Sequence, residues 1–347
     1  MSEIIEALTE AVEDACVRHP SSADTNWNAA LWSALDQIGI TLLSIDEEEG
    51  GSGGDVSAAA AVLEVLGEYC AEVPFVETAL QGAWLLASCR AEIPAGPMTA
   101  AVAGSGVTLA EESGAWTIDG ELTRVPWARI AEHLVVLAGR HVVLLGRNDF
   151  EIEAGTNVAG EPRDRVTMRR VSLPASSVHS VPEDSDVTEE LFVARGAVGR
   201  MAMSSGASRR ALRMSLAYAS ERTQFGRPLG AFQSVQHQIA RMAGEVMLCK
   251  TVSKFSAMAL DEKEPSWQFE VAAAQVSTGE AAGTVAKIAH QVHGAIGFTE
   301  EHDLRLCTTR IWSWRDEYGG ARRRAEEVGA RALDAGAAGL WPLLAGK

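Results

Sequence analysis

The feature that most constrains the fold of this chain is a long apolar stripe in its C-terminal half. Small and apolar side chains recur there in alternating steps of three and four, at Val271, Ala274, Thr278, Ala281, Val285, Ile288 and Val292. This spacing places all seven on one face of a helix. Ile239, Met242 and Val246 repeat the pattern on a preceding segment. The C-terminal half is therefore predicted to be a bundle of long helices.

The hydrophobic pattern of the sequence changes twice along the chain. Residues 58–66 and 79–86 are broad apolar stretches typical of helices, and an acidic, glycine-rich loop covers residues 47–55. Short β-like runs follow at 115–118, 134–138, 141–145 and 166–171, separated by Gly, Asp, Asn and Pro. We predict a mainly α fold with a small central β domain. Its divisions are a helical domain at 1–95, a β domain at 96–184 and a helical bundle at 185–347.

Small residues make the first helix of that bundle unusual. Gly196, Gly199 and Gly206 lie within it, and each interior glycine costs about 1 kcal/mol of helix propensity relative to alanine. Another group must therefore approach this backbone closely. Tight helix packing and contact with a ligand both meet that requirement.

Composition narrows the possible environments and partners. No run reaches the roughly 18 apolar residues of a membrane span, and the acidic start does not resemble a basic secretion signal. We expect a cytoplasmic protein that does not bind membranes. A formal net charge of −17 argues against nucleic acid, which requires clustered Lys and Arg. The five cysteines, with no CxxC pair, indicate reduced and mostly buried thiols.

Two motifs about sixty residues apart indicate a site for a nucleotide diphosphate. The first, ERTQFGRPLGAFQ, covers residues 221–233, and the second, QVHGAIGFTEEHDL, covers residues 291–304. Arg222 can bind a pyrophosphate through two donors, because its guanidinium matches phosphate geometry. The glycines at 294 and 297 allow backbone amides to approach a phosphate without an intervening side chain.

With these motifs, the chain resembles the acyl-CoA dehydrogenase family nearly from end to end. These FAD enzymes desaturate acyl-CoA thioesters between the α and β carbons. The resemblance implies a central β-barrel domain that covers one face of the flavin. It also implies FAD as cofactor, an acyl-CoA substrate and an electron-transfer flavoprotein as redox partner. The length and branching of the acyl group are left open.

The resemblance carries the cofactor contacts over residue by residue. Arg222 matches the arginine that reaches the FAD pyrophosphate, and Phe225 and Leu229 match its apolar neighbours. Gln233, Gln291 and Gly294 match residues that contact FAD, the two glutamines doing so across a subunit interface. At least a dimer is therefore implied, either a homo-oligomer or a heterotetramer with a related subunit.

The family's catalytic base is a carboxylate that follows the second motif, and its register is open here. The matching stretch is RIWSWRDEYGG, residues 310–320. Alignment on Arg310 and Ile311 assigns the base to Asp316, and alignment on the acid-glycine pattern assigns it to Glu317. A third alignment gives Tyr318, which is not a base. We favour Glu317 for its longer reach. The same two acids are also suited to capping the next helix.

The β segment departs from the family pattern. Arg124 and Pro126 stand where the family has a tryptophan and a threonine beside the flavin, and Trp127 could restore only the stacking role.

A second hypothesis follows, in which the chain is a non-catalytic, FAD-supporting subunit of a heteromer. A third is an acyl-CoA oxidase or monooxygenase on the same fold. No metal site is predicted, since His290 and His293 lack a third ligand at helical spacing.

Overall fold

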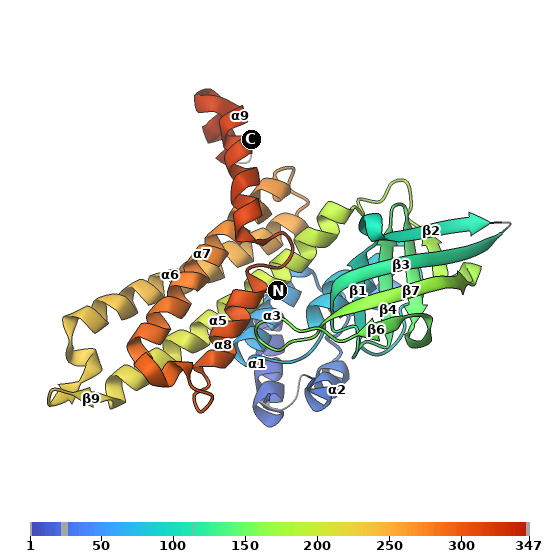
Figure 1. The fold of residues 1–347 in the computed structure, drawn as a ribbon. Helices are drawn as coiled ribbons and strands as arrows, with labels where there is room; N and C mark the ends of the chain where they lie inside the picture. The colour runs from blue at the N-terminus through green and yellow to red at the C-terminus, as the bar shows by residue number, and fades with distance from the viewer. Residues whose placement is uncertain (1, 22–26, 113, 345–347) are drawn as a thin grey trace. The chain divides into compact units, whose positions relative to one another are not determined.

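The structure is a computed structural model that describes residues 2–21, 27–112 and 114–344 (Figure 1). By internal contacts the chain divides into two compact units. Unit 1 comprises Met1–Pro20, Ala60–Ala71 and Ala197–Lys347, and unit 2 comprises Ser21–Ala59 and Glu72–Gly196. The predicted division at residues 95 and 184 stays a prediction. No helix among the described residues is both long and apolar enough to cross a membrane.

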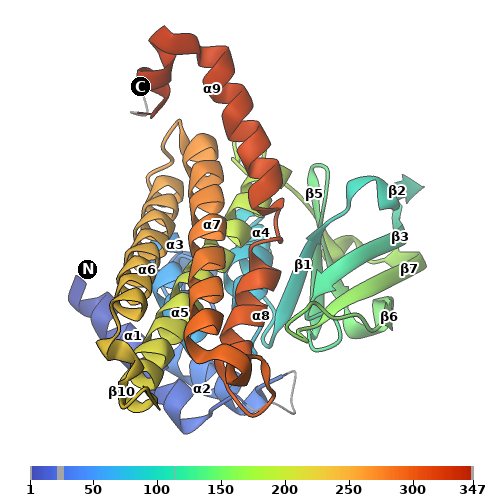
Figure 2. The same ribbon diagram turned by 60° about the vertical axis from the view of Figure 1, so that its left-hand side comes forward.

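Helices dominate both ends of the chain. The N-terminal helices are α1 (Ser2–Arg18), α2 (Ala29–Ile38), α3 (Val56–Glu68) and α4 (Ala83–Ser88), the last preceded by a π-helical segment, Val76–Gly82. The C-terminal helices are α5 (Glu189–Glu221), α6 (Gln233–Asp261), α7 (Trp267–His293), α8 (Leu304–Trp314) and α9 (Gly320–Leu344). In Figures 1 and 2, α6 and α7 run side by side in unit 1.

The predicted stripe on α7 is confirmed. All seven of its residues are buried, and Met242 and Val246 are buried on α6 while Ile239 is half-buried. These faces form the apolar core of the bundle, because a helix with one apolar face is stabilised by packing it against another.

Two glycines allow α3 and α5 to cross in direct backbone contact within unit 1. A Cβ on Gly206 of α5 would lie 1.9 Å from the carbonyl oxygen of Glu64, and one on Gly67 of α3 would lie 2.1 Å from that of Met203. The small residues of α5 therefore serve tight helix packing at Gly206, one of the two readings that the sequence allows.

The strands form two four-stranded sheets in unit 2. One has the order β1 (Met98–Val102), β4 (His133–Ala138), β5 (His141–Gly146) and β8 (Val178–Ser180). The other has the order β2 (Val107–Glu112), β3 (Ala115–Pro126), β7 (Arg163–Leu173) and β6 (Glu151–Glu153). Only β1 and β4 pair in parallel; the other ladders are antiparallel. All four predicted β runs lie within these strands.

Strand β4 is buried on both faces, which explains its unbroken apolar sequence. Leu134 and Val136 belong to a core with residues of both sheets, such as Ile118 and Val166. Val135 and Leu137 face the opposite way and pack in a second core with Leu86 and other helical residues. Alternate side chains of a strand point to opposite faces, so one strand serves two cores.

The cysteines are free, as predicted from their spacing. Four are buried and Cys89 is partly exposed. The sulfur atoms of Cys70 and Cys307 lie 3.7 Å apart inside unit 1.

Candidate functional site

The first motif forms an exposed hairpin between α5 and α6. Strands β9 (Thr223–Gln224) and β10 (Arg227–Pro228) pair across a two-residue turn. The turn residues Phe225 and Gly226 both have positive φ, 53° and 79°, as tight hairpins require. The carbonyl of Arg222 accepts the amide of Leu229 at 2.8 Å, which closes the hairpin base.

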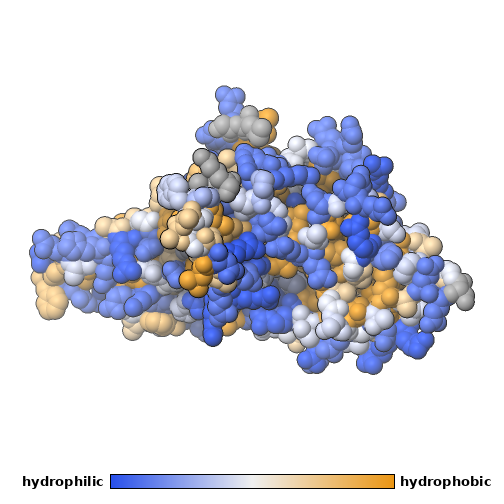
Figure 3. Space-filling model, turned by 90° about the horizontal axis from the view of Figure 1, so that it is seen from above, coloured by the Kyte–Doolittle hydropathy of each residue, from blue (hydrophilic) through white to orange (hydrophobic). Residues whose placement is uncertain are grey.

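The predicted cofactor residues of this motif reach solvent. Arg222 and Gln233 are exposed, Leu229 is half-buried, and the Phe225 side chain is 92% exposed. Figure 3 shows hydrophobic surface at its left-hand end, where Figure 1 labels β9. A single exposed apolar side chain is common on protein surfaces, so the exposure of Phe225 does not by itself identify a ligand.

The second motif ends α7 and forms a short 3-10 turn, Gly294–Phe298. Gly294 adopts φ 63° and ψ −143°, a conformation that is essentially restricted to glycine. Its amide donates to the carbonyl of His290 and caps the helix. Gln291 is exposed one residue beyond His290. The chain therefore requires glycine at this turn for backbone reasons alone.

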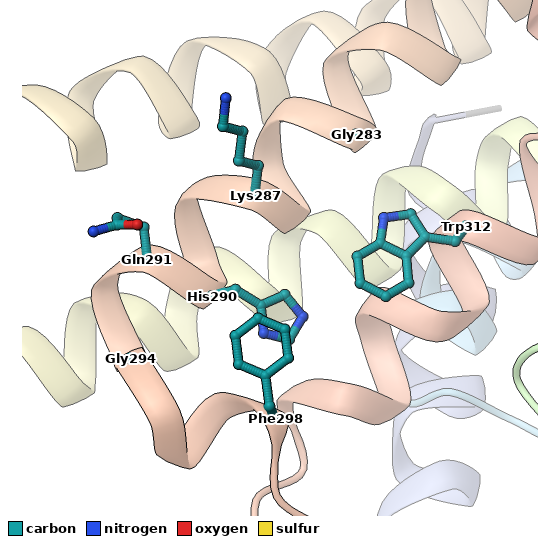
Figure 4. Close-up of a pocket in the computed structure, with 7 residues that line it drawn as sticks. All are labelled: Gly283, Lys287, His290, Gln291, Gly294, Phe298 and Trp312. Carbon is teal, nitrogen blue, oxygen red and sulfur yellow. The ribbon is translucent and has the colours of Figure 1, made fainter.

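A pocket of about 410 Å³ opens beside this turn (Figure 4). It is lined by Gly283, Lys287, His290, Gln291, Gly294, Phe298 and Trp312. The His290 ring stacks between Phe298, at 4.1 Å between ring centroids, and Trp312, at 5.6 Å. Lys287 extends away from this stack. The pocket thus combines an exposed cation, a side-chain amide and an aromatic surface.

His290 and His293, in the last turn of α7, both have structural contacts. His290 Nε2 lies 3.0 Å from the Thr308 hydroxyl, and His293 Nδ1 lies 2.8 Å from the carbonyl oxygen of Ala289. Burial lowers the pKa of His290 and of His293, so both rings are neutral at pH 7. His290 Nδ1 is buried and has no hydrogen-bond partner among the described residues.

The two motifs meet at one end of unit 1. Tyr218, one turn before Arg222, stacks on His293 with 4.7 Å between ring centroids and 27° between planes. The hairpin and the glycine turn are thus neighbours, although about sixty residues separate them in the sequence.

The candidate base lies in the turn between α8 and α9. Glu317 is nearly buried, with a side chain 9% exposed, and its Oε2 accepts a hydrogen bond from Arg200 Nε at 2.6 Å. Asp316 is 67% exposed and lies 3.5 Å from its neighbour Arg315. The following residues Tyr318, Gly319 and Gly320 all have positive φ, so they form the sharp turn expected there.

Arg200 is a site residue that sequence reasoning missed. It lies on α5 in the stretch GAVGRMAMSSGA, where it is the one charged residue among small and apolar neighbours. Its side chain is 4% exposed. A lone charge in a buried helical stretch needs a partner, and that signal was available in the sequence although the identity of the partner was not.

Strand β3 is irregular where the family resemblance predicts the residues beside the flavin. The register of β3 against β7 shifts between Leu122 and Val125, and Arg124 has φ 58° within that bulge. Trp127 directly follows the strand and is 2% exposed. Its indole is packed inside unit 2, so the stacking role predicted for it stays a prediction.

Comparison with known proteins defines the class. Residues 187–333 match the family model for the acyl-CoA dehydrogenase C-terminal domain, and residues 2–92 match that for the N-terminal domain. The chain belongs to the acyl-CoA dehydrogenase family. It is accordingly an oxidoreductase that acts on acyl-CoA, and the family implies a flavin cofactor.

Individual relatives agree with this assignment. The acyl-CoA dehydrogenase IpdE2 of Mycolicibacterium smegmatis is 28% identical over 319 residues, covering 89% of this chain and 93% of the relative. Butyryl-CoA dehydrogenase from Megasphaera elsdenii has a similar fold, with a TM-score of 0.86 at 19% identity over 96% of this chain and 99% of that chain. A chain of the ChsE4-ChsE5 complex from Mycobacterium tuberculosis also has a similar fold, with a TM-score of 0.84 at 22% identity over 96% of this chain and 98% of that chain. The mainly α fold with a sheet domain, predicted from the sequence, is confirmed.

Proposed function

We propose that the chain is a subunit of an FAD-dependent acyl-CoA dehydrogenase that desaturates an acyl thioester between its α and β carbons. The observation that carries the proposal is the meeting of the two motifs at one end of unit 1. Exposed Arg222 and Phe225 lie on one motif, and the pocket beside Gly294 lies on the other. Tyr218 and His293 join the two.

The residues present fit a flavin nucleotide. Lys287 and Arg222 are exposed cations suited to a diphosphate, Gln291 is an exposed amide, and Gly294 leaves its backbone open to approach. The buried, unsatisfied Nδ1 of His290 is a further polar atom at this pocket. We propose Arg222, Phe225, Leu229, Gln233, Gln291 and Gly294 as FAD contacts. For Trp127, which is buried within unit 2, the role beside the flavin rests on the family resemblance alone.

Glu317 is the proposed general base. Desaturation breaks the C–H bonds at Cα and Cβ and forms the double bond between these carbons. The Glu317 carboxylate takes the proton from Cα, and a bound flavin supplies the acceptor for the hydride from Cβ. Glu317 rather than Asp316 is favoured because its carboxylate is held in a defined direction, whereas Asp316 is solvated.

A second candidate is the FAD-supporting, non-catalytic subunit of a heteromer. The bulge at Arg124 favours it, because it alters the strand segment where the family has the residues beside the flavin. The similarity to a chain of the ChsE4-ChsE5 complex also supports it. Such an assembly holds fewer FAD molecules than chains, and co-expression with a related subunit raises its flavin content.

The remaining partners follow from the same proposal. Electrons leave the assembly through an electron-transfer flavoprotein, and the protein works in the cytoplasm. Peroxide formation in air would instead support an oxidase or a monooxygenase on this fold.

Substitution of Arg222 tests the cofactor site. Arg222→Ala removes charge-assisted contacts worth about 1.5–3 kcal/mol, so the purified variant is depleted of flavin. Arg241→Ala is the control. Arg241 is a 68% exposed arginine on α6 that forms an ion pair with Glu245 of the same helix. An Arg222→Ala protein as yellow as the parent would count against the site.

Substitution of the two acids tests the base. Glu317→Gln keeps FAD but lowers acyl-CoA-dependent flavin reduction by at least about 100-fold, the usual contribution of a positioned base. Asp316→Asn retains activity. The opposite pattern moves the role to Asp316, and full activity in both variants assigns the base to another chain.

A further inference from the structure

Arg200 is buried in unit 1, where several contacts fix its guanidinium. Its Nε donates to Glu317, and its Nη1 lies 3.4 Å from the Met203 sulfur. The guanidinium carbon lies 5.8 Å from the centroid of the Tyr318 ring. An arginine cannot lose its charge in a protein, so the positive charge at this position is permanent.

The backbone beside Glu317 is fixed from two other helices. Gln275 of α7 donates to the carbonyl oxygen of Glu317 at 3.0 Å. Arg324 of α9 donates to Gln275 at 3.2 Å and to the carbonyl of Tyr318 at 3.4 Å. Arg315 and Asp316 in the same turn are the nearest charges along the chain. The side chain of Glu317 is thus oriented from α5, and its backbone from α7 and α9.

A small cavity adjoins the ion pair. It measures about 10 Å³ and is lined in part by Arg200, Ser204, Gln275 and Thr278. The Thr278 hydroxyl is buried and has no hydrogen-bond partner among the described residues. Ala197, Met201 and Trp314 also line this cavity, so polar and apolar side chains pack closely around Arg200.

We infer that Arg200 is the positioning residue for the base and holds the Glu317 carboxylate aimed in one direction. The inference rests on the proposed function. A guanidinium that donates to a carboxylate through a short hydrogen bond restricts that side chain to one orientation. A base held in one direction loses less freedom when the α proton is brought to it. Arg200 does not touch the substrate in this role; it acts through Glu317.

The test follows exchange of the α proton in deuterium oxide by mass spectrometry, using the protein with any subunit that co-purifies. Butyryl-, isobutyryl- and cholyl-CoA are each tried with the parent protein. The probe is the one whose α proton exchanges fastest. Arg200→Met is expected to lower the exchange rate at pH 7 by at least about 100-fold. The rate is recorded as a pH–rate profile for the parent and for each variant. Arg200→Lys, which keeps the charge, is expected to recover part of the lost rate.

Controls separate this inference from the proposed function. Arg209→Met removes an arginine of the same helix that pairs with Glu68 and lies outside the site, and it leaves the profile unchanged. Adding Arg200→Met to Glu317→Gln causes no further loss of exchange if Arg200 acts through Glu317. A folded Arg200→Met protein with the parent profile overturns the inference alone. Parental exchange in Glu317→Gln, or no exchange by the parent with any probe, overturns the proposed base and the inference together.

Discussion

Gly206→Ala should destabilise the protein, although alanine is the better helix former. The added Cβ would lie 1.9 Å from the Glu64 carbonyl oxygen and 2.6 Å from the Glu68 amide nitrogen. Both are backbone atoms, so no side chain can rotate away, and ordinary contact requires the helices to separate by about 1.5 Å. We expect such overpacking to cost about 3 kcal/mol, offset by about 1 kcal/mol of helix propensity.

The net loss of about 2 kcal/mol is measurable as a lower midpoint of urea unfolding, followed by circular dichroism. Gly244→Ala is the matched control, because a Cβ on this glycine of α6 meets nothing within 4 Å. That variant should gain up to about 1 kcal/mol. Equal stability of Gly206→Ala and Gly244→Ala would refute the backbone contact between α3 and α5.

Two further predictions concern unit 2 and the thiols. Asp164 is completely buried and accepts hydrogen bonds from the Arg129 side chain and from the amides of Arg129 and Gly155. Asp164→Asn should therefore lower the free energy of unfolding by about 3 kcal/mol and speed proteolysis of the sheets. Glu151→Gln, which removes a charge from an exposed ion pair, should change neither the free energy of unfolding nor the rate of proteolysis. Among the cysteines, burial raises the pKa of Cys16 and of Cys249 to about 12, and the hydrogen bond with Cys70, followed by burial, raises that of Cys307 well above its usual range. Burial raises the pKa of Cys89 as well, so its partial exposure is what distinguishes it from the four buried cysteines. A disulfide reagent at pH 8 should therefore modify about one thiol per native chain, Cys89, and five after denaturation. Rapid modification of a Cys89→Ser protein would contradict this assignment.

Periodicity was sufficient to predict the elements whose burial follows from local spacing. The α7 stripe repeats with the helical period, whereas β4 and β5 are short unbroken apolar runs buried on both faces. The loop at residues 47–55 was predicted only as acidic and glycine-rich. In the structure a Cβ on Gly51 would lie 2.1 Å from the carbonyl oxygen of Ile45, so this glycine serves a close backbone approach.

Features set by distant contacts could not be predicted. The apolar stretch at residues 79–86 predicts a helix, and the first part of that helix is π-helical in the structure. Distant contacts surround this part: Ser44 donates a hydrogen bond to the Ala79 carbonyl, and Thr78 donates one to the Met98 carbonyl. Arg200 and Glu317 are 117 positions apart, and only the fold pairs them. The two motifs were each readable, but their contact through Tyr218 and His293 was not.

The most direct test of the account is the visible spectrum of the purified protein, recorded without air before and after addition of acyl-CoA. The account predicts a bound flavin, identified as FAD after release, whose absorbance bleaches with a suitable acyl-CoA. One FAD per chain with bleaching by this chain alone selects the self-sufficient enzyme. Fewer FAD molecules than chains, with bleaching only after a related subunit is added, selects the heteromer. A protein that binds no flavin, alone or with such a subunit, would contradict the account.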